Sequence, residues 1–210
     1  MNDLVTRSLT GAALILLALM AAVVGGYYFA VLVAAAATAI FYEWTRLVKG
    51  WGAGWYVAGI VAALVPALAL LWIRDRADDG LALLLWVFIV TWATDIGGYV
   101  VGRAIGGRKL APAISPGKTW AGLYGGMAAA ALCGAFWVLF AELDRLLLAL
   151  APVFAIVAQA GDLFESWMKR RAGVKDSGDW LPGHGGVFDR LDGMLPVAVL
   201  TAAVVLSGRL

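Results

Sequence analysis

The charged side chains of this sequence gather in one strip, residues 166–192, which reads SWMKRRAGVKDSGDWLPGHGGVFDRLD. The strip lies between two long apolar segments and holds nearly a third of the charged residues, together with the only histidine, His184. Ionisable groups beside a bilayer are costly unless they are paired or bind a ligand. We therefore expect the strip to form a functional site that the rest of the chain holds at a membrane surface.

The apolar segment that leads into the strip carries carboxylates and cations at helical spacing. Asp162, Glu165 and Lys169 are spaced i, i+3 and i+7, so they share one face of a helix. Ser166 and Arg170 flank that face. A carboxylate at membrane depth, with basic groups nearer the water, indicates a metal ion inside and anions outside. An ion pair between Glu165 and Lys169 is the structural alternative, and it is compatible with a functional role.

The loop after this helix contains Lys175 and Asp176, and then His184 between glycines. Glycines such as Gly185 and Gly186 let a ligand approach the backbone closely. Their N–H groups can also line a concavity that binds phosphate. The loop is therefore a candidate wall of a phosphate site.

Two more carboxylates stand where the last apolar segment begins. Asp189 and Asp192 are spaced i and i+3, with Arg190 between them, and capping of a helix is the structural alternative for either one. With Asp162 they supply three carboxylates, no sulfur ligand and a single histidine, which favours Mg²⁺ over zinc. Mg²⁺ typically binds one or two carboxylates plus the phosphates of a substrate, which suits oxygen ligands surrounded by Lys and Arg.

Asp95 lies within an apolar segment, in the sequence TWATDIGGYVVG. A carboxylate at membrane depth must face the interior of the helix bundle, water or a cation. Pairing with a nearby arginine is the structural alternative to a role at the site.

The short run from Ser115 to Thr119 predicts a turn followed by the start of a helix. Two hydroxyls, Lys118 and free N–H groups at a helix N-terminus make an anion site suited to phosphate, although an ordinary helix cap would use the same residues. The Gly-Lys-Thr sequence resembles the end of a P-loop, but Pro112 stands where that motif needs glycine, and no strand is predicted before it. We reject the P-loop interpretation.

The composition is that of an integral membrane protein. Of the 210 residues, 63% are hydrophobic and only 14% are charged, whereas soluble domains are about 25% charged. The net charge of +2 gives no indication of nucleic-acid binding. The first apolar run continues through Tyr42, so we expect a retained anchor and not a signal peptide. The apolar segments predict an all-α fold of about seven transmembrane helices, near residues 8–24, 28–48, 55–73, 81–101, 119–141, 144–168 and 190–208.

The positive charges support this layout. With the N-terminus in the cytoplasm and alternating sides, the cytoplasmic face receives twelve Lys and Arg residues, namely Arg7, Arg46, Lys49, Arg103, Arg108, Lys109, Lys118, Lys169, Arg170, Arg171, Lys175 and Arg190. The other face receives four, namely Arg74, Arg76, Arg145 and Arg209. This asymmetry matches the positive-inside rule and places both chemically rich loops, about 102–118 and 169–190, in the cytoplasm.

The segments also predict different roles for the two parts of the chain. We expect residues 1–80 to form a scaffold of transmembrane helices and residues 81–210 to form the catalytic region. The glycines spaced four apart indicate close helix contacts; these are Gly98, Gly102, Gly106, Gly122 and Gly126. From these residues alone, phosphoryl or nucleotidyl transfer to a lipid at the membrane surface is the chemistry that fits.

The strip resembles the pattern of the phosphatidate cytidylyltransferases, also called CDP-diacylglycerol synthases. The matching residues are Ser166-x-x-Lys169-Arg170, Lys175-Asp176 and Leu181-Pro182-x-His184-Gly185-Gly186-x-x-Asp189-Arg190-x-Asp192. Earlier blocks, Asp95-x-x-x-Tyr99-x-x-Gly102 and Ser115-Pro116-x-Lys118-Thr119-x-x-Gly122, are also similar to that family. The likeness covers the C-terminal half well, whereas the N-terminal helices share only a general apolar character.

The resemblance implies an enzyme of the bacterial cytoplasmic membrane that makes CDP-diacylglycerol and pyrophosphate from CTP and phosphatidic acid. It implies Mg²⁺ at Asp162 and Asp189, with support from Asp192 and Asp95, and K⁺ as a second ion that could share the site. The cations Lys169, Arg170, Lys175 and Arg190 would neutralise phosphates. A homodimer is compatible with the sequence.

The remaining roles complete the catalytic and substrate-binding set. Ser115, Lys118 and Thr119 would bind a phosphate from the opposite wall, next to Ser166, Asp176, Gly185 and Gly186. Because phosphatidate is already largely anionic near pH 7, His184 is expected to donate to phosphate and not to act as a base.

Two other functions are alternatives. A CTP-dependent lipid kinase, for example one acting on a polyprenol, would use similar groups but would transfer the γ-phosphate and release CDP. An ion or solute transporter could use Asp95 and Asp162 as relay carboxylates. The charges gather in loops, however, and no inverted repeats are evident, which argues against transport.

Overall fold

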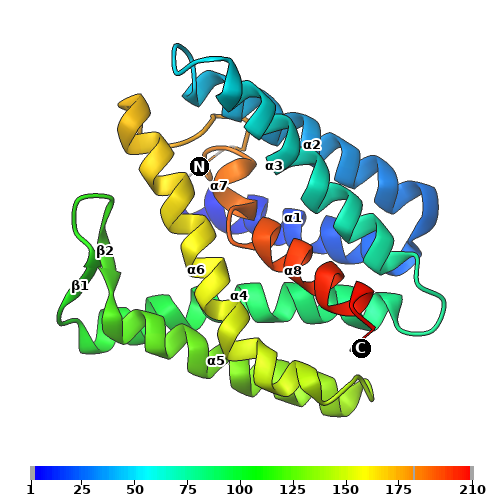
Figure 1. The fold of residues 1–210 in the computed structure, drawn as a ribbon. Helices are drawn as coiled ribbons and strands as arrows, with labels where there is room; N and C mark the ends of the chain where they lie inside the picture. The colour runs from blue at the N-terminus through cyan, green and yellow to red at the C-terminus, as the bar shows by residue number, and fades with distance from the viewer. Residues whose placement is uncertain (1–2, 182, 209–210) are drawn as a thin grey trace.

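The computed structural model describes residues 3–181 and 183–208, so Pro182 of the strip and Arg209 lie outside the described residues. Each predicted apolar segment forms helix (Figure 1). The helices are α1 (Asp3–Val24), α2 (Gly26–Leu47), α3 (Ala53–Arg74), α4 (Gly80–Ile105), α5 (Trp120–Phe140), α6 (Leu146–Ala172), α7 (Phe188–Leu191) and α8 (Met194–Leu206).

Five of the helices in the described part of the chain, α2 to α6, are long and apolar enough to cross a membrane. The chain is therefore a helical integral membrane protein, as its composition predicted. The apolar part of α1 (Leu9–Val24) and α8 are shorter, so the count of seven spans stays a prediction.

The two ends of the charged strip differ from the predicted helix bounds. Helix α6 continues past residue 168 to Ala172 and stops at Gly173, whose φ of 72° is in the left-handed region that favours glycine. The predicted helix 190–208 was wrong as one unit, because it is divided into α7 and α8. Pro196 has no N–H to donate to the carbonyl of Asp192, which explains the break at residues 192–193.

A small β-hairpin replaces the predicted turn at Ser115. Strand β1 (Lys109–Ala111) pairs antiparallel with β2 (Ser115–Thr119), with Lys109 opposite Thr119. The turn lies at residues 112–114 instead, so the turn prediction at 115–117 was wrong. The predicted helix start is confirmed, since the Thr119 side chain accepts a hydrogen bond from the Gly122 N–H at 3.0 Å and caps α5.

Glycines allow α4 and α5 to pack closely along their length (Figure 1). A Cβ at Gly122 would meet the carbonyl oxygen of Gly98 at 2.8 Å, and a Cβ at Gly102 would lie 3.3 Å from the Cα of Gly122. Gly126 also faces a carbonyl of α4, at 2.8 Å. The predicted close contact is confirmed for these glycines. Gly106 differs, because it ends α4 with a φ of 66° and has no atom within 4 Å of its Cβ position.

The short helix α7 lies between the N-terminal helices and α6. It packs against α2 on one side and α6 on the other, and the chain then continues into α8, which lies against α3 and α6 (Figure 1). The loop 173–187 therefore returns from the end of α6 to the middle of the molecule. This path brings the charged strip next to the N-terminal helices.

Replacing Gly126 by Leu should lower the melting temperature in detergent. A larger side chain would meet backbone of α4 that cannot move aside, and overpacking of this kind costs about 1–3 kcal/mol. The matched control is Gly54→Leu, since Gly54 lies in α3 with no atom within 4 Å of its Cβ position. Equal melting temperatures for the two variants would contradict the role of glycine in the α4–α5 contact.

Candidate active site

A cavity of about 1290 Å³ connects the charged strip with the interior of the helix bundle. Its polar lining comes from α4, the hairpin, α6, the loop and residues 189–192, and comprises Asp95, Tyr99, Arg103, Lys109, Lys118, Thr119, Gln159, Asp162, Lys169, Asp176, Asp189, Arg190 and Asp192. Apolar residues, mostly of α1 to α4, line much of the rest, including Leu14, Ile15, Leu32, Val33, Phe88 and Trp92. The cavity thus joins an ionic region to an apolar one.

The hairpin and α6 meet through Lys118. Its ammonium group forms an ion pair with Asp162 and donates a hydrogen bond to Gln159 Oε1 at 3.0 Å. Ser166 Oγ donates to Asp162 Oδ1 at 3.3 Å from the next turn of the same helix. The two walls predicted from the sequence are therefore in contact, and Gln159 is an additional residue that orients Lys118.

Three carboxylates, those of Asp95, Asp162 and Asp192, are near enough to repel one another across the cavity. Burial, and then the charge of Asp162, raise the pKa of Asp192 well above its usual range, with a smaller contribution from Asp95. Lys118 opposes this shift. The charged form of these buried carboxylates would therefore be stabilised by a bound cation.

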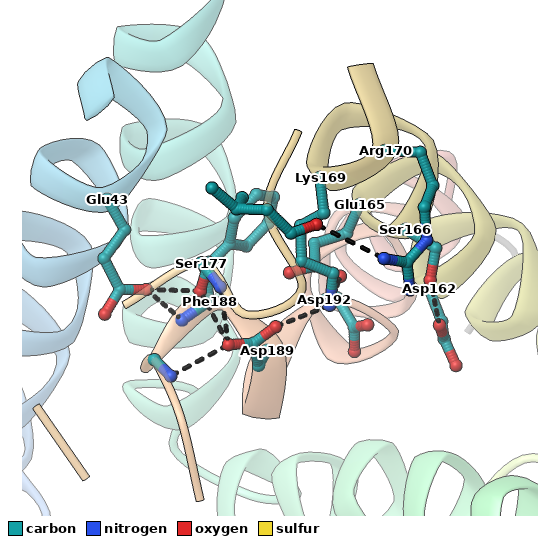
Figure 2. Close-up of polar contacts among 12 residues, drawn as sticks. Glu43, Asp162, Glu165, Ser166, Lys169, Arg170, Ser177, Phe188, Asp189 and Asp192 are labelled. Atoms are coloured by element: carbon teal, nitrogen blue, oxygen red, sulfur yellow. Dashed lines mark hydrogen bonds and ion pairs between the residues drawn. The ribbon is translucent and has the colours of Figure 1, made fainter. Parts of the chain in front are cut away.

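A second cluster centres on Asp189 (Figure 2). Its Oδ1 lies 2.6 Å from Lys169 Nζ, which also pairs with Glu165 at 2.6 Å, so the predicted Glu165–Lys169 ion pair is confirmed. Its Oδ2 accepts hydrogen bonds from Ser177 N and Oγ, both at 2.9 Å, and from Gly186 N at 2.8 Å. Burial acts to raise the pKa of Asp189. A side-chain hydrogen bond with the Glu165 carboxyl, which needs a proton between the two groups, acts together with Lys169 and the Gly186 N–H to outweigh burial and lower the pKa to about 2.

Glu43 of α2 supports this cluster from the opposite side (Figure 2). Its side chain is fully buried and accepts hydrogen bonds from Val187 N at 2.9 Å, Phe188 N at 2.8 Å and Ser177 Oγ at 2.9 Å. The sequence analysis missed both Glu43 and Ser177. An acidic residue inside an apolar helix was the signal available for Glu43, as it was for Asp95.

The glycines after His184 serve the packing of the loop. Gly186 N–H was predicted to face phosphate, but in this structure it donates to Asp189. A Cβ at Gly186 would also meet the carboxylate of Glu43 at 2.5 Å. Gly185 has a φ of 79°, a backbone conformation that favours glycine.

The other predicted site residues lie outside the cavity lining. In the described part of the chain, these are Ser115, Ser166, Arg170, Lys175, His184, Gly185 and Gly186. Arg170 donates to the carbonyl oxygens of Ile114 at 3.2 Å and Val174 at 3.3 Å, so it ties the hairpin and the loop to α6. His184 lies against α1, with Nε2 3.2 Å from the Cβ position of Gly11. Lys175 is exposed.

The fold and the cavity define a membrane-embedded protein whose lining of carboxylates and cations suits phosphorylated ligands. The chain belongs to the cytidylyltransferase family, whose model matches residues 51–207.

Curated relatives of the chain carry the name phosphatidate cytidylyltransferase. A relative from Brucella suis is 47% identical over 161 residues, covering 73% of this chain and 58% of the relative. One from Pseudomonas aeruginosa is 38% identical over 173 residues, covering 80% and 64%. One from Staphylococcus epidermidis is 40% identical over 144 residues, covering 67% and 55%. The chain thus spans about three fifths of the length of the relatives it matches.

Asp192→Asn should flatten the pH dependence of stability in the absence of divalent ions. Because the folded-state pKa is raised, the unfolded chain ionises first, and wild-type stability should fall as the pH rises from about 4, the usual value for Asp, toward the raised value. Asparagine cannot ionise, so that loss disappears. Melting temperatures in EDTA across this window measure the effect, and the exposed Asp78→Asn variant should keep the wild-type slope. If the melting temperature of Asp192→Asn depended on pH as the wild type does, the raised pKa of Asp192 would be contradicted.

Proposed function

We propose that this protein transfers the cytidylyl group of CTP to phosphatidic acid, giving CDP-diacylglycerol and pyrophosphate. The observation that carries this proposal is one cavity that joins carboxylates, Lys118, Lys169 and Arg190 to an apolar region between helices. A nucleoside triphosphate needs the charged groups, and a diacyl lipid needs the apolar region. The names of the curated relatives favour this reaction over a lipid kinase or a transporter.

The site fits Mg²⁺ through its donor set. No three His, Cys, Asp or Glu side chains among the described residues are grouped closely enough to hold a metal ion by themselves. Mg²⁺ rarely needs such a cage, because it usually binds one or two carboxylates together with substrate phosphates and water. The repelling carboxylates on the cavity wall would supply those ligands, and all of them offer oxygen.

Asp162 and Asp189 would hold the metal ion, with Asp192 and Asp95 supporting it. Asp189 Oδ1 has Lys169 as its described hydrogen-bond donor, and a carboxylate oxygen can take a second ligand. When bound, Mg²⁺ would supply charge neutralisation to the phosphates of CTP. K⁺ at the same site stays a prediction.

The cations would hold the two phosphorylated substrates against each other. Lys118 stands on β2, opposite Asp162, and can exchange this carboxylate for a phosphate oxygen when CTP enters. Lys169 and Arg190 line the side that α6 and α7 supply. The phosphatidate oxygen would then attack the α-phosphorus in line, so that a new P–O bond forms as the bond to pyrophosphate breaks. Positioning and charge account for most of the catalysis in such transfers.

The apolar lining would receive the acyl chains of phosphatidic acid. Leu14 and Ile15 of α1 and Leu32 of α2 belong to the same cavity as the ionic groups, so a lipid can keep its chains in apolar surroundings while its phosphate reaches Lys118. This requires the ionic end to lie at the membrane surface. The positive-inside asymmetry supports a cytoplasmic position for that end, and we propose seven spans in a bacterial cytoplasmic membrane.

Isotope-labelled CTP distinguishes the proposed reaction from the kinase. With phosphatidic acid and Mg²⁺, label at the α-phosphate should enter the lipid product, and label at the γ-phosphate should appear in pyrophosphate. EDTA should stop both, and added Mg²⁺ should restore them. Transfer of γ-label to a lipid would contradict the proposal and support a kinase.

Asp162→Asn should lower cytidylyl transfer by at least about 100-fold, because charge stabilisation at a transferring phosphate is worth this much or more. Asparagine keeps the size of the side chain but loses the negative charge that faces Lys118. Production of labelled CDP-diacylglycerol by purified protein measures the loss. The control is Asp78→Asn, the same change at an exposed site. Near-normal activity of Asp162→Asn, with membrane insertion unchanged, would refute the assignment.

A further inference from the structure

The carboxylate of Glu43 fixes the start of α7 although it lies far away in the sequence. Glu43 Oε1 accepts from Val187 N and Oε2 accepts from Phe188 N, at 2.9 and 2.8 Å. These are N–H groups at the helix N-terminus, which have no partner within the helix itself. Such groups are usually capped by a neighbouring side chain. Here the cap comes from α2.

The same carboxylate also reaches the cluster around Asp189. The Ser177 hydroxyl lies 2.9 Å from Glu43 Oε2 and 2.9 Å from Asp189 Oδ2. Glu43 is therefore connected through the Ser177 hydroxyl to Asp189, whose side chain lines the cavity. This link joins α2, the loop and α7 into one polar unit (Figure 2).

The loop is shaped to receive Glu43. A Cβ at either Gly178 or Gly186 would meet a Glu43 carboxylate oxygen at 2.5 Å, so only glycine leaves room for it. The side chain of Glu43 is fully buried, and Trp44 beside it packs on Phe188 with ring centroids 5.8 Å apart. The length and the charge of Glu43 are thus both matched by the surrounding chain.

One helical turn such as α7 is not stable by itself, because forming the first turn costs more than its hydrogen bonds return. Its direction must therefore come from contacts made outside the turn. Asp189 and Arg190 both lie on α7 and both line the cavity. If α7 were released, both side chains would lose their fixed positions.

We propose that Glu43 is a positioning residue, which clamps Ser177, Val187 and Phe188 so that Asp189 and Arg190 face the substrates. The importance of this clamp for catalysis rests on the proposed function, whereas the clamp itself does not. Glu43 precedes residues 51–207, which match the family model, and it lies in the segment that we expected to be scaffold alone. The proposal assigns the N-terminal helices a part in the site.

Glutamine at position 43 is the sharpest test. An ionised carboxylate only accepts hydrogen bonds, whereas an amide has one accepting oxygen and a donating NH₂ group. In either orientation of the Glu43→Gln amide, the NH₂ group would face a backbone N–H, that of Val187 or that of Phe188, with almost no change in volume. The matched control is Glu142→Gln, the same substitution at an exposed residue after α5. Ser177→Ala is a second, milder variant that removes the hydroxyl between Glu43 and Asp189 but keeps the Ser177 N–H on Asp189.

Hydrogen–deuterium exchange of the whole protein in detergent measures how firmly Glu43 holds the loop and α7. Peptides covering residues 177–193 should exchange faster in Glu43→Gln than in the wild type or Glu142→Gln, while peptides from α4 and α5 stay unchanged. Steady-state assays with CTP should show kcat reduced about 10- to 100-fold, as for other residues that orient a ligand-binding group. Ser177→Ala should lower kcat by less and leave the Val187 and Phe188 amides protected.

The outcomes separate the two proposals. Unchanged exchange at residues 177–193 in Glu43→Gln would overturn the clamp. Faster exchange with wild-type kcat and KM would overturn its role in positioning. If Glu43→Gln does not fold, wild-type kcat in Ser177→Ala would count against the link to Asp189. A wild-type protein that makes no CDP-diacylglycerol would refute the proposed function, while the exchange data would still decide whether Glu43 holds the loop.

Discussion

Buried negative charge is the constraint on which this structure depends. Carboxylates taken out of water need cations or N–H and O–H donors around them, since an uncompensated buried charge is costly. Asp189 meets this need with Lys169, Ser177 and Gly186, and Glu43 meets it with the N-terminus of α7. The loop after α6 is folded back into the bundle because these donors and acceptors satisfy one another.

The carboxylates on the other side of the cavity have fewer hydrogen-bond donors and cations around them among the described residues. Asp95, Asp162 and Asp192 repel one another, and Lys118 is the described cation in direct contact with them. One half of the site is therefore a satisfied network that holds its shape, and the other keeps unbalanced charge. Under the proposed function, the fixed half would hold Asp189 in place and position the substrates, while the carboxylates of the other half would complete the site for a metal ion and phosphate.

In a membrane, the position of the ionic groups depends on close packing of the helices. The glycine contacts bring α4 and α5 together, and Thr119, which caps α5, lies 3.1 Å from the Cβ position of Gly102 in α4. Lys118 precedes this cap and contacts Gln159 of α6. In an apolar solvent, helix contacts depend on close packing of small residues and not on the exclusion of water. The precision of the ionic site thus depends on helix packing beside it, since Gly98, Gly102 and Gly122 also line the cavity.

The sequence alone determined the class of protein, the positions of the long helices and most of the ionic residues. Composition and apolar length impose helices on a chain in a membrane, and the density of charge in residues 166–192 indicates a site because such groups are costly beside a bilayer unless they are paired or bind a ligand. It also indicated the Glu165–Lys169 pair and the α4–α5 glycine contact, because both depend on residues at fixed helical spacing.

The tertiary structure decided which of these residues meet. Arg170 donates to the Ile114 carbonyl of the hairpin and Lys169 pairs with Asp189, and neither contact follows from local spacing. Glu43 is the clearest case, since it contacts residues more than 130 positions later in the chain. A hydrogen bond between distant segments depends on how the helices pack in three dimensions, and helical periodicity carries no information about that.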